Sequence, residues 1–303
     1  MALPIVDCHI HCFSDEEQAR AFMSRVVKQP QATRIGTVAQ LEESIKASGI
    51  PRTNILMYTP GAIYYEDAIA KYPSDKERAR REVVQRIERN NDWAASFTKQ
   101  RKGLSFFCGI DPVHMTEREM LSGIERWVAA GAKGVKFVPA SLKIFGDDKR
   151  LLPVYDYCQS RNIPILTQSA GNPAPGHEFA FGSPVPFGRA LPNFPSLRLI
   201  FAHMGWSSYR PDDGADDLRD LARKYPDVCT DMSLRLDEAA SDAKAAAWLV
   251  STTRKMGAGH ILFGTNFPLA DSKKSLDAFM RLPLKESERE LIAHKNFERL
   301  TTR

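Results

Sequence analysis

Residues 5–13 read IVDCHIHCF and join an apolar, β-branched run to two histidines that are separated by one residue. Alternation along a β-strand places Asp7, His9 and His11 on one face and the intervening residues on the other. Paired histidines with this spacing occur in hairpins and on surfaces as well as at metal sites. The position of this pair at the end of a strand near the N-terminus favours metal ligands.

Seven further apolar runs follow along the chain, and each precedes a stretch with helical periodicity. The eight candidate strands cover residues 4–13, 54–60, 104–111, 134–140, 164–170, 198–205, 227–233 and 260–268. Eight alternating strand and helix units predict an α/β fold, namely a (β/α)8 TIM barrel that forms a single domain over residues 1–303. An open doubly wound sheet is the alternative.

Helix signals separate these strands. Residues 116–131 show helical spacing, with Thr116 and Glu119 arranged as a capping box and Gly131 as a C-terminal stop. The spacing also predicts helices over 236–257 and 286–299.

The segment 61–102, after the second strand, is too long for a simple connection, and its pattern predicts an insertion of two or more helices. At the carboxyl-terminal mouth of a barrel this insertion would be a lid or a substrate-selecting element, or else a packing or dimer surface. The sequence leaves these roles open.

Composition narrows the class of protein. The formal net charge of +5 comes from 42 basic and 37 acidic residues, and the densest basic cluster, at 76–81, is interleaved with acids, so we expect a solvated helix face and no nucleic-acid partner. The five cysteines form no CxxC pair, which indicates reduced thiols. Without a basic signal region or an apolar run of about 20 residues, we expect a cytoplasmic protein with no membrane partner.

Polar residues stand where five of the predicted strands end. They are Lys136, Gln168, His203, Asp231 and Asn266. Each has an ordinary structural explanation, such as a capping lysine or an amide that satisfies loop carbonyls. Because the carboxyl ends of barrel strands meet at one mouth, the group as a whole favours an active site.

The loops that follow these strands offer substrate-binding residues. Trp206 and Tyr209 come just after His203 and would line an aromatic pocket, although helix packing is an equal alternative for Trp206. His177 lies in a Pro- and Gly-rich loop after the fifth strand. Together with Lys136, Arg235 or Arg210 from later loops would suit a substrate that carries a carboxylate.

The chain resembles the amidohydrolase-2 family of the amidohydrolase superfamily, which includes aminocarboxymuconate-semialdehyde decarboxylase, related ring-carboxylate decarboxylases and dicarboxylate lactonases. The resemblance rests on DCHIH, GAKGVKFVPASLKIFGDDKRLLPVYDYCQSRNIPIL leading to TQSAGN, PSLRLIFAHMG, ILFGTNFP and IAHKNFERL, which together span residues 5–300. It implies that His9 and His11 are metal ligands and that His203 is a catalytic group. It also implies a small-molecule substrate, and a homodimer is common among relatives.

Two positions depart from the family pattern. Gln168 stands where the family has a histidine ligand, and Asn266 stands where it has an aspartate. The amide of Asn266 is not a base near neutral pH, and both amide oxygens are weaker ligands than the groups they replace. We therefore expect a divalent metal, zinc or manganese, to be weakly held or absent. The same exchanges would also be made deliberately to trap a substrate in a metal-dependent parent.

Three functions follow from this pattern. The first is hydrolysis of an amide or lactone in a small carboxylate- or carbonyl-bearing substrate, with His203, Asn266, Gln168 and Lys136 as catalytic residues. In that case Asp231, Asp271 or His177 would supply the missing carboxylate or ligand. The second is a metal-independent lyase, decarboxylase or cyclase that uses His9, His11 and His203. The third is a non-catalytic binding protein.

Overall fold

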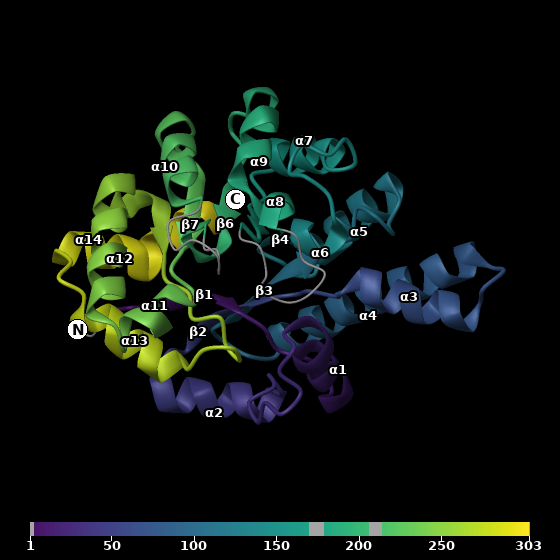
Figure 1. The fold of residues 1–303 in the computed structure, drawn as a ribbon, viewed down its shortest axis with the longest axis horizontal. Helices are drawn as coiled ribbons and strands as arrows, with labels where there is room; N and C mark the ends of the chain where they lie inside the picture. The colour runs from purple at the N-terminus through teal and green to yellow at the C-terminus, as the bar shows by residue number, and fades with distance from the viewer. Residues whose placement is uncertain (1–2, 170–178, 206–213, 303) are drawn as a thin grey trace.

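Eight parallel strands form one sheet in the order of the chain (Figure 1). The computed structural model describes residues 3–169, 179–205 and 214–302, without the side chains of residues 179 and 180. The strands are β1 (Val6–Ile10), β2 (Arg52–Leu56), β3 (Leu104–Gly109), β4 (Gly134–Phe137), β5 (Ile165–Thr167), β6 (Leu199–Phe201), β7 (Val228–Asp231) and β8 (Ile261–Leu262). Each of the eight predicted strands is therefore present, although the observed strands are shorter.

Backbone hydrogen bonds between β1 and the chain around the end of β8 close the sheet into a barrel. The N–H groups of Cys8 and His11 donate to the carbonyls of Phe263 and Phe267 at 3.0 and 2.7 Å. In the opposite direction, the N–H of Asn266 donates to the carbonyl of His9 at 2.8 Å. This closure confirms the predicted barrel over the open sheet.

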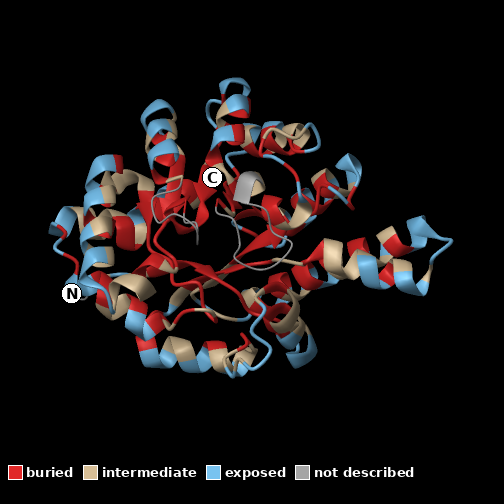
Figure 2. Ribbon diagram, viewed as in Figure 1, coloured by how far each residue is buried: buried red, intermediate tan, exposed pale blue. Residues whose placement is uncertain are grey.

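Helices surround the barrel, and their outer faces are exposed while the strands are buried (Figure 2). Those between β1 and β5 are α1 (Glu16–Ala21), α2 (Val38–Ser48), α3 (Gly61–Lys71), α4 (Lys76–Lys99), α5 (Glu117–Ala129), α6 (Pro139–Leu142) and α7 (Leu152–Ser160). Those after β5 are α8 (Phe179–Gly182), α9 (Pro184–Ala190), α10 (Ala215–Lys224), α11 (Arg235–Ala239), α12 (Ala243–Met256), α13 (Ser272–Arg281), α14 (Glu286–Glu290) and α15 (Asn296–Thr301). In the part of the chain that the structure describes, no helix is long and apolar enough to cross a membrane.

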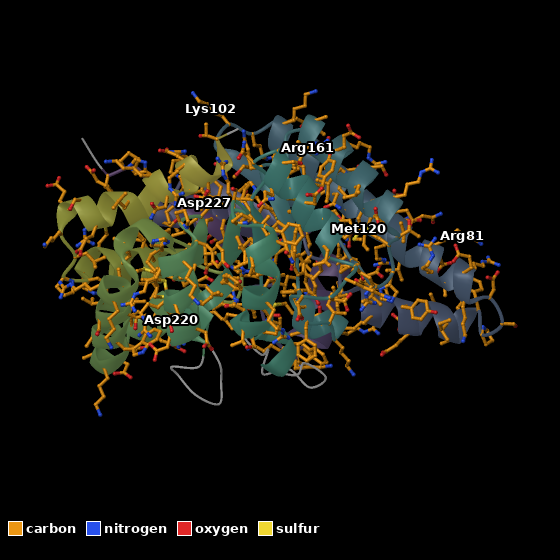
Figure 3. All side chains as sticks on the ribbon, turned by 90° about the horizontal axis from the view of Figure 1, so that it is seen from above. Arg81, Lys102, Met120, Arg161, Asp220 and Asp227 are labelled. Atoms are coloured by element: carbon orange, nitrogen blue, oxygen red, sulfur yellow. The ribbon has the colours of Figure 1, made fainter. Side chains whose placement is uncertain are left out.

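The barrel interior is filled from its amino-terminal end. Phe297 and Leu300 of α15 belong to the same buried cluster as Val6, Leu56 and other apolar residues of the strands. Lys102 and Arg161, which precede β3 and β5, lie toward this end in Figure 3. The opposite, carboxyl-terminal end is left for a functional site, as in other barrels of this kind.

A register shift in β1 corrects one expectation about its faces. The pairing of β1 with β2 shifts between Asp7 and Ile10. Cys8 packs in the barrel interior, whereas the carboxylate of Asp7 accepts hydrogen bonds from the backbone N–H and the hydroxyl of Thr265 at 3.0 and 2.6 Å. His9 and His11 remain neighbours, with ring centroids 5.3 Å apart. The strict alternation that grouped Asp7 with them was wrong because a bulge interrupts it.

Two helix predictions differ in outcome. The helix over 116–131 is confirmed as α5, and its capping box between Thr116 and Glu119 is present. The stretch 236–257 is not one helix but two, α11 and α12, because Asp242 lies in an extended conformation and its side chain caps α12 by accepting from the N–H of Lys244. A short polar residue at this point offers the backbone a new helix start.

The predicted helical insertion after β2 consists of α3 and α4, which form a hairpin that projects from the barrel (Figure 1). Arg81 lies on this projecting part (Figure 3). The second half of α4 packs on β3, where the side-chain amide of Asn91 pairs with both the carbonyl and the N–H of Gly109 at 2.8 Å each. One side chain thus fixes the hairpin to the carboxyl end of β3.

Replacement of Asn91 by Ala is expected to lower the free energy of unfolding by about 2–4 kcal/mol, because two buried backbone groups of Gly109 lose their partners. Urea denaturation followed by circular dichroism measures this change. The control is Ser96→Ala on the exposed face of the same helix, which should cost less than about 0.5 kcal/mol. Equal losses in both variants would contradict this role for Asn91.

Candidate active site

A cavity of about 340 Å³ opens at the carboxyl-terminal end of the barrel. It brings together six of the predicted site residues, which come from five different strand ends. They are His9, His11, Lys136, Gln168, His203 and Asn266. The expectation that polar strand ends meet at one mouth is therefore met for these residues.

Apolar side chains form the walls of the cavity, and several were missed from the sequence. Phe22 and Val26 belong to a π-helical turn, Phe22–Val26, that continues α1 and covers the cavity together with Val27. The predicted insertion over 61–102 contributes no residue to the described lining of the cavity. A sequence signal for this covering turn does exist, because the apolar residues of FMSRVV, residues 22–27, interrupt an otherwise polar stretch. Tyr58, Val138, Leu234 and Leu269 complete the walls.

Asp231 lies behind the histidines, and both of its carboxylate oxygens are hydrogen-bonded. One carboxylate oxygen is 2.8 Å from Nδ1 of His9. The other accepts from the backbone N–H groups of His203 and Ser233, at 3.1 and 3.0 Å, and from the hydroxyl of Ser233. Burial alone would raise the pKa of Asp231, but the charge and hydrogen bond of His9 outweigh it, so the pKa lies below its usual range.

The same contacts define the proton positions on the three histidines. Nδ1 of His9 donates to Asp231, and Nδ1 of His11 donates to the carbonyl of Leu56 at 3.1 Å. Because the hydroxyl of Ser233 donates to Asp231, it accepts from Nδ1 of His203 at 2.6 Å. All three histidines line the cavity, and with the proton on Nδ1 each ring has an unprotonated Nε2 available to a bound group.

Burial keeps these imidazoles neutral. It lowers the pKa of His9, although Asp231 opposes the shift. It lowers the pKa of His11 well below the ordinary value, and that of His203 to about 3, with the charge of His9 acting in the same direction. At neutral pH the floor of the cavity therefore presents three nitrogen lone pairs and no imidazolium.

Lys136 at β4 is the buried cation of this cavity. Its side chain is only 2% exposed, and no described residue accepts a hydrogen bond from its amine. Burial lowers the pKa of Lys136 to about 7, although the charge of Asp231 opposes the shift. A lysine in this state can bind an anion as an ammonium ion or release a proton near neutral pH.

The two residues that depart from the family pattern carry buried oxygen atoms without a partner. Oε1 of Gln168 and Oδ1 of Asn266 have no hydrogen bond, although both residues line the cavity. Asn266 has a φ of +69°, a conformation in which Asn and Asp are among the better tolerated residues. Such oxygen atoms require a donor or a cation from a bound group.

This donor set fits a divalent metal. His9, His203 and Asp231 have potential ligand atoms within 4.8 Å of one another, but Asp231 and the Nδ1 atoms are already hydrogen-bonded. A carboxylate or carbonyl on Nδ1 is the usual support for a histidine that binds metal through Nε2. The atoms that remain for a metal are Nε2 of His9, His11 and His203, with the unpartnered oxygens of Gln168 and Asn266.

Other predicted site residues are not placed with this group. Arg235 is buried outside the set that lines the cavity, where it pairs with Glu238 at 2.9 Å and lies over the ring of Trp248. Asp271 caps α13 and pairs with Arg34 at 3.0 Å. Trp206, Tyr209, Arg210 and His177 lie outside the described residues.

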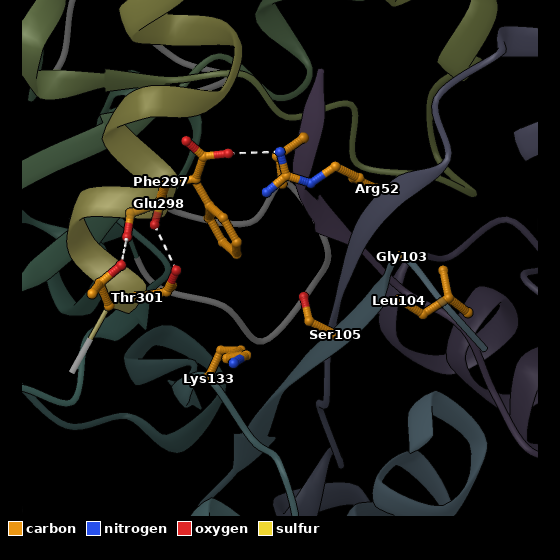
Figure 4. Close-up of a pocket in the computed structure, with 10 residues that line it drawn as sticks. Arg52, Gly103, Leu104, Ser105, Lys133, Phe297, Glu298 and Thr301 are labelled. Carbon is orange, nitrogen blue, oxygen red and sulfur yellow. Dashed lines mark hydrogen bonds and ion pairs between the residues drawn. The ribbon is translucent and has the colours of Figure 1, made fainter. Parts of the chain in front are cut away.

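A second hollow, of about 540 Å³, lies at the opposite end of the barrel (Figure 4). There Arg52 is paired with Glu298 at 2.6 Å, and Lys133 is exposed. Because the histidine cluster faces the other mouth, we assign the chemistry to the cavity at the carboxyl ends of the strands.

The barrel and its histidine pair define the class of protein, and comparison with known families agrees. The chain belongs to the Amidohydrolase family, whose profile matches residues 6–300. This confirms the resemblance seen in the sequence and makes the chain an enzyme of the amidohydrolase superfamily. No curated protein matches the chain.

Solved structures share the fold at low identity. The chain is similar to 2,6-dihydroxybenzoate decarboxylase from Rhizobium, with 17% identity, a TM-score of 0.72 and 99% of both chains covered. A dihydroxybenzoic acid decarboxylase from Polaromonas sp. JS666, with bound manganese and the inhibitor 2-nitroresorcinol, has 17% identity, a TM-score of 0.71 and coverage of 99% and 97%. A protein from Pseudomonas putida with the provisional name 2-pyrone-4,6-dicarboxylic acid hydrolase has 14% identity, a TM-score of 0.61 and coverage of 99% and 98%.

Replacement of Lys136 by Met is expected to stabilise the fold at pH 6–7. The folded pKa of about 7 lies below the ordinary 10.5, so the cost of burying the charge is fully present below pH 7, falls as the pH rises, and disappears near pH 10.5. This cost is about 1.4 kcal/mol for each pKa unit of the shift. Thermal unfolding from pH 6 to pH 10 should show the two proteins converging, and a constant difference would contradict this assignment.

Proposed function

We propose that this protein is a lyase that releases CO2 from a small ring compound bearing a carboxylate. The observation that carries the proposal is Asn266, an amide at the strand 8 position, which cannot take a proton from water. Decarboxylation needs a proton donor at the carbon that loses CO2, whereas hydrolysis needs a base for water. The cavity offers the donor, in Lys136, and has its buried carboxylate, Asp231, fully engaged.

A divalent cation, of which manganese is the candidate, would be held by His9, His11, Gln168 and Asn266. When bound, it would neutralise the charge of the substrate carboxylate and fix the orientation of the ring. Manganese accepts oxygen ligands readily, which suits a set with two amide oxygens. The manganese-containing decarboxylase from Polaromonas supports this choice of metal.

Lys136 would be the general acid. In the reaction the bond between the ring and the carboxylate carbon breaks, its electron pair stays on the ring carbon, and that carbon takes a proton from the ammonium group of Lys136. Because the pKa of Lys136 is about 7, a large fraction of this residue carries the proton near neutral pH. Solvent protons then restore the ammonium ion.

His203 would orient the substrate. Its Nδ1 is bonded to Ser233 at 2.6 Å, which fixes the ring and leaves Nε2 as an acceptor for a hydroxyl next to the carboxylate. The apolar walls from Phe22, Val26 and Tyr58 suit a single aromatic ring. A hydroxybenzoate has all of these features, and ring acids of this kind are named for the decarboxylases from Rhizobium and Polaromonas.

Hydrolysis of a lactone or amide is the second candidate. Asp237 and Glu238 line the rim of the cavity and would supply a base for water. Both are partly exposed and engaged in ion pairs, with Lys274 at 3.3 Å and Arg235 at 2.9 Å. Each carboxylate is already paired with a cation, so decarboxylation is the function that the described residues support best.

The test is release of labelled CO2 from 2,6-dihydroxybenzoate and its positional isomers, with the ring product followed by chromatography. We expect turnover by the manganese-loaded protein and a loss of about 100-fold or more in kcat for Lys136→Met, which removes the acid. Cleavage of lactones or amides without CO2 release would overturn the proposal in favour of hydrolysis.

A matched control for this variant is Lys133→Met. Lys133 precedes the same strand but is exposed at the other end of the barrel (Figure 4), so the same loss of charge should change kcat by less than about twofold. An equal loss of kcat in both variants would show that the loss results from removing a positive charge anywhere on the protein, and not from removing the proton donor.

The metal assignment predicts that His11→Ala lowers bound manganese at least about tenfold, because it removes one of two imidazole ligands. Metal content after loading and desalting is measured by inductively coupled plasma mass spectrometry. His260→Ala is the control, since His260 bonds to the carbonyl of Val228 away from the cavity and should leave metal content unchanged. Full metal content in His11→Ala would contradict the assignment.

A further inference from the structure

Four residues that line the cavity, His9, His11, Gln168 and Asn266, would offer a cation only electrically neutral donor atoms. A histidine that keeps its proton on Nδ1 and binds a metal through Nε2 is a neutral ligand, and the two amides cannot ionise. A divalent ion at these atoms would gain no negative charge from its own ligands. Because a buried charge without a counter-charge is costly, such a set alone holds a cation weakly.

Asp231 does not supply the missing negative charge directly. Its two oxygens are bonded to His9, to the backbone N–H groups of His203 and Ser233, and to the hydroxyl of Ser233. Ligation by Asp231 would break several of these buried hydrogen bonds at once, and each lost partner costs about 1–3 kcal/mol. Asp231 therefore supports a metal from behind the ring of His9 and does not ligate it.

We propose that a divalent metal and a carboxylate ligand each bind this site more tightly when the other is present. The carboxylate oxygen of the substrate would supply the negatively charged metal ligand that the protein lacks. The inference rests on the proposed ring-carboxylate function and extends it to the order and selectivity of binding. By thermodynamic linkage, a carboxylate that tightens metal binding by a given factor is itself bound more tightly by the same factor when the metal is present.

A consequence for selectivity follows. A neutral ligand of the same shape would fill the cavity but leave the cation without a counter-charge, so the metal would not be retained. The site would thus reject uncharged analogues by loss of the metal as well as by loss of direct contacts.

Asn266 provides the means to test this inference. Its φ of +69° is compatible with Asp, so Asn266→Asp places a carboxylate among the donors with little backbone strain. The variant should bind metal without help from a ligand, because the protein then carries the negative oxygen itself.

The experiment measures Mn²⁺ binding to the whole chain by the loss of the electron paramagnetic resonance signal of free Mn²⁺. It is done alone, with benzoate and with benzamide, which is its uncharged isostere. For the wild-type protein we expect benzoate to lower the Kd of Mn²⁺ at least about tenfold and benzamide to change it less than about twofold. For Asn266→Asp we expect a Kd at least about tenfold lower without any ligand and a benzoate effect of less than about threefold.

Gln85→Glu is the matched control, because it adds the same charge on the exposed face of α4. It should leave the Kd of Mn²⁺ within about twofold of the wild-type value. Circular dichroism and thermal unfolding establish that each variant is folded.

Three results would overturn the inference: equal Kd values in benzoate and benzamide, no binding of Mn²⁺ by the wild-type protein in benzoate, or an Asn266→Asp variant that binds no more tightly than the wild type. Benzoate lacks the ring hydroxyls and is not consumed, so the measurement does not depend on turnover. Interdependent binding without CO2 release from any ring acid would refute only the proposed function. CO2 release with independent binding would refute only this inference.

Discussion

The backbone hydrogen bonds that close the barrel determine both the fold and the position of the site. Bonds from Cys8 and His11 to the chain after β8 remove the open edges of the sheet, and the bond from the N–H of Asn266 to the carbonyl of His9 sets the last strand end beside the first. Residues more than 250 positions apart in the sequence therefore meet at one mouth. Every contact in the cavity depends on this closure.

Burial then decides the charge of the cavity. It keeps the three imidazoles neutral and lowers the pKa of Lys136 to about 7, while Asp231 remains ionised because His9 and nearby N–H groups stabilise its charge. The histidine cluster is thus accompanied by one hydrogen-bonded carboxylate, Asp231, and one titratable amine, Lys136, while Asp237 and Glu238 also line the cavity. These charges suit donation of a proton to carbon better than activation of water. They also favour a ligand that carries a negative charge.

Prediction of the site from the sequence succeeded where topology alone places a residue. The ends of parallel barrel strands converge whatever their neighbours are, so His9, Lys136, Gln168, His203 and Asn266 could be grouped without coordinates. It failed where a local feature interrupts a regular pattern. The bulge in β1 placed the carboxylate of Asp7 against Thr265 and outside the group of imidazoles, and Asp242 divided a stretch with continuous helical spacing into two helices.

The segment that covers the cavity was also not identified from the sequence, for a different reason. The long insertion after β2 was predicted as a possible lid, yet among the described residues none of 61–102 lines the cavity, whereas Phe22 and Val26 of the turn Phe22–Val26 do. Periodicity does not reveal which apolar side chains will face the mouth, because the direction of a loop is set by packing against elements that are distant in sequence. Arg235, which the sequence offered as a substrate ligand, is for the same reason packed against Trp248.

The sequence by itself determined the eight strand and helix units, the family, and the chemical types that reach the mouth, because hydrophobic periodicity and motif spacing are local properties of the chain. Only the tertiary structure decided how those groups act. Hydrogen bonds from Asp231, Leu56 and Ser233 fix which nitrogen of each histidine faces the cavity, and burial sets the charge of Lys136. These properties arise from long-range contacts and from exclusion of water, which do not exist until the barrel has closed.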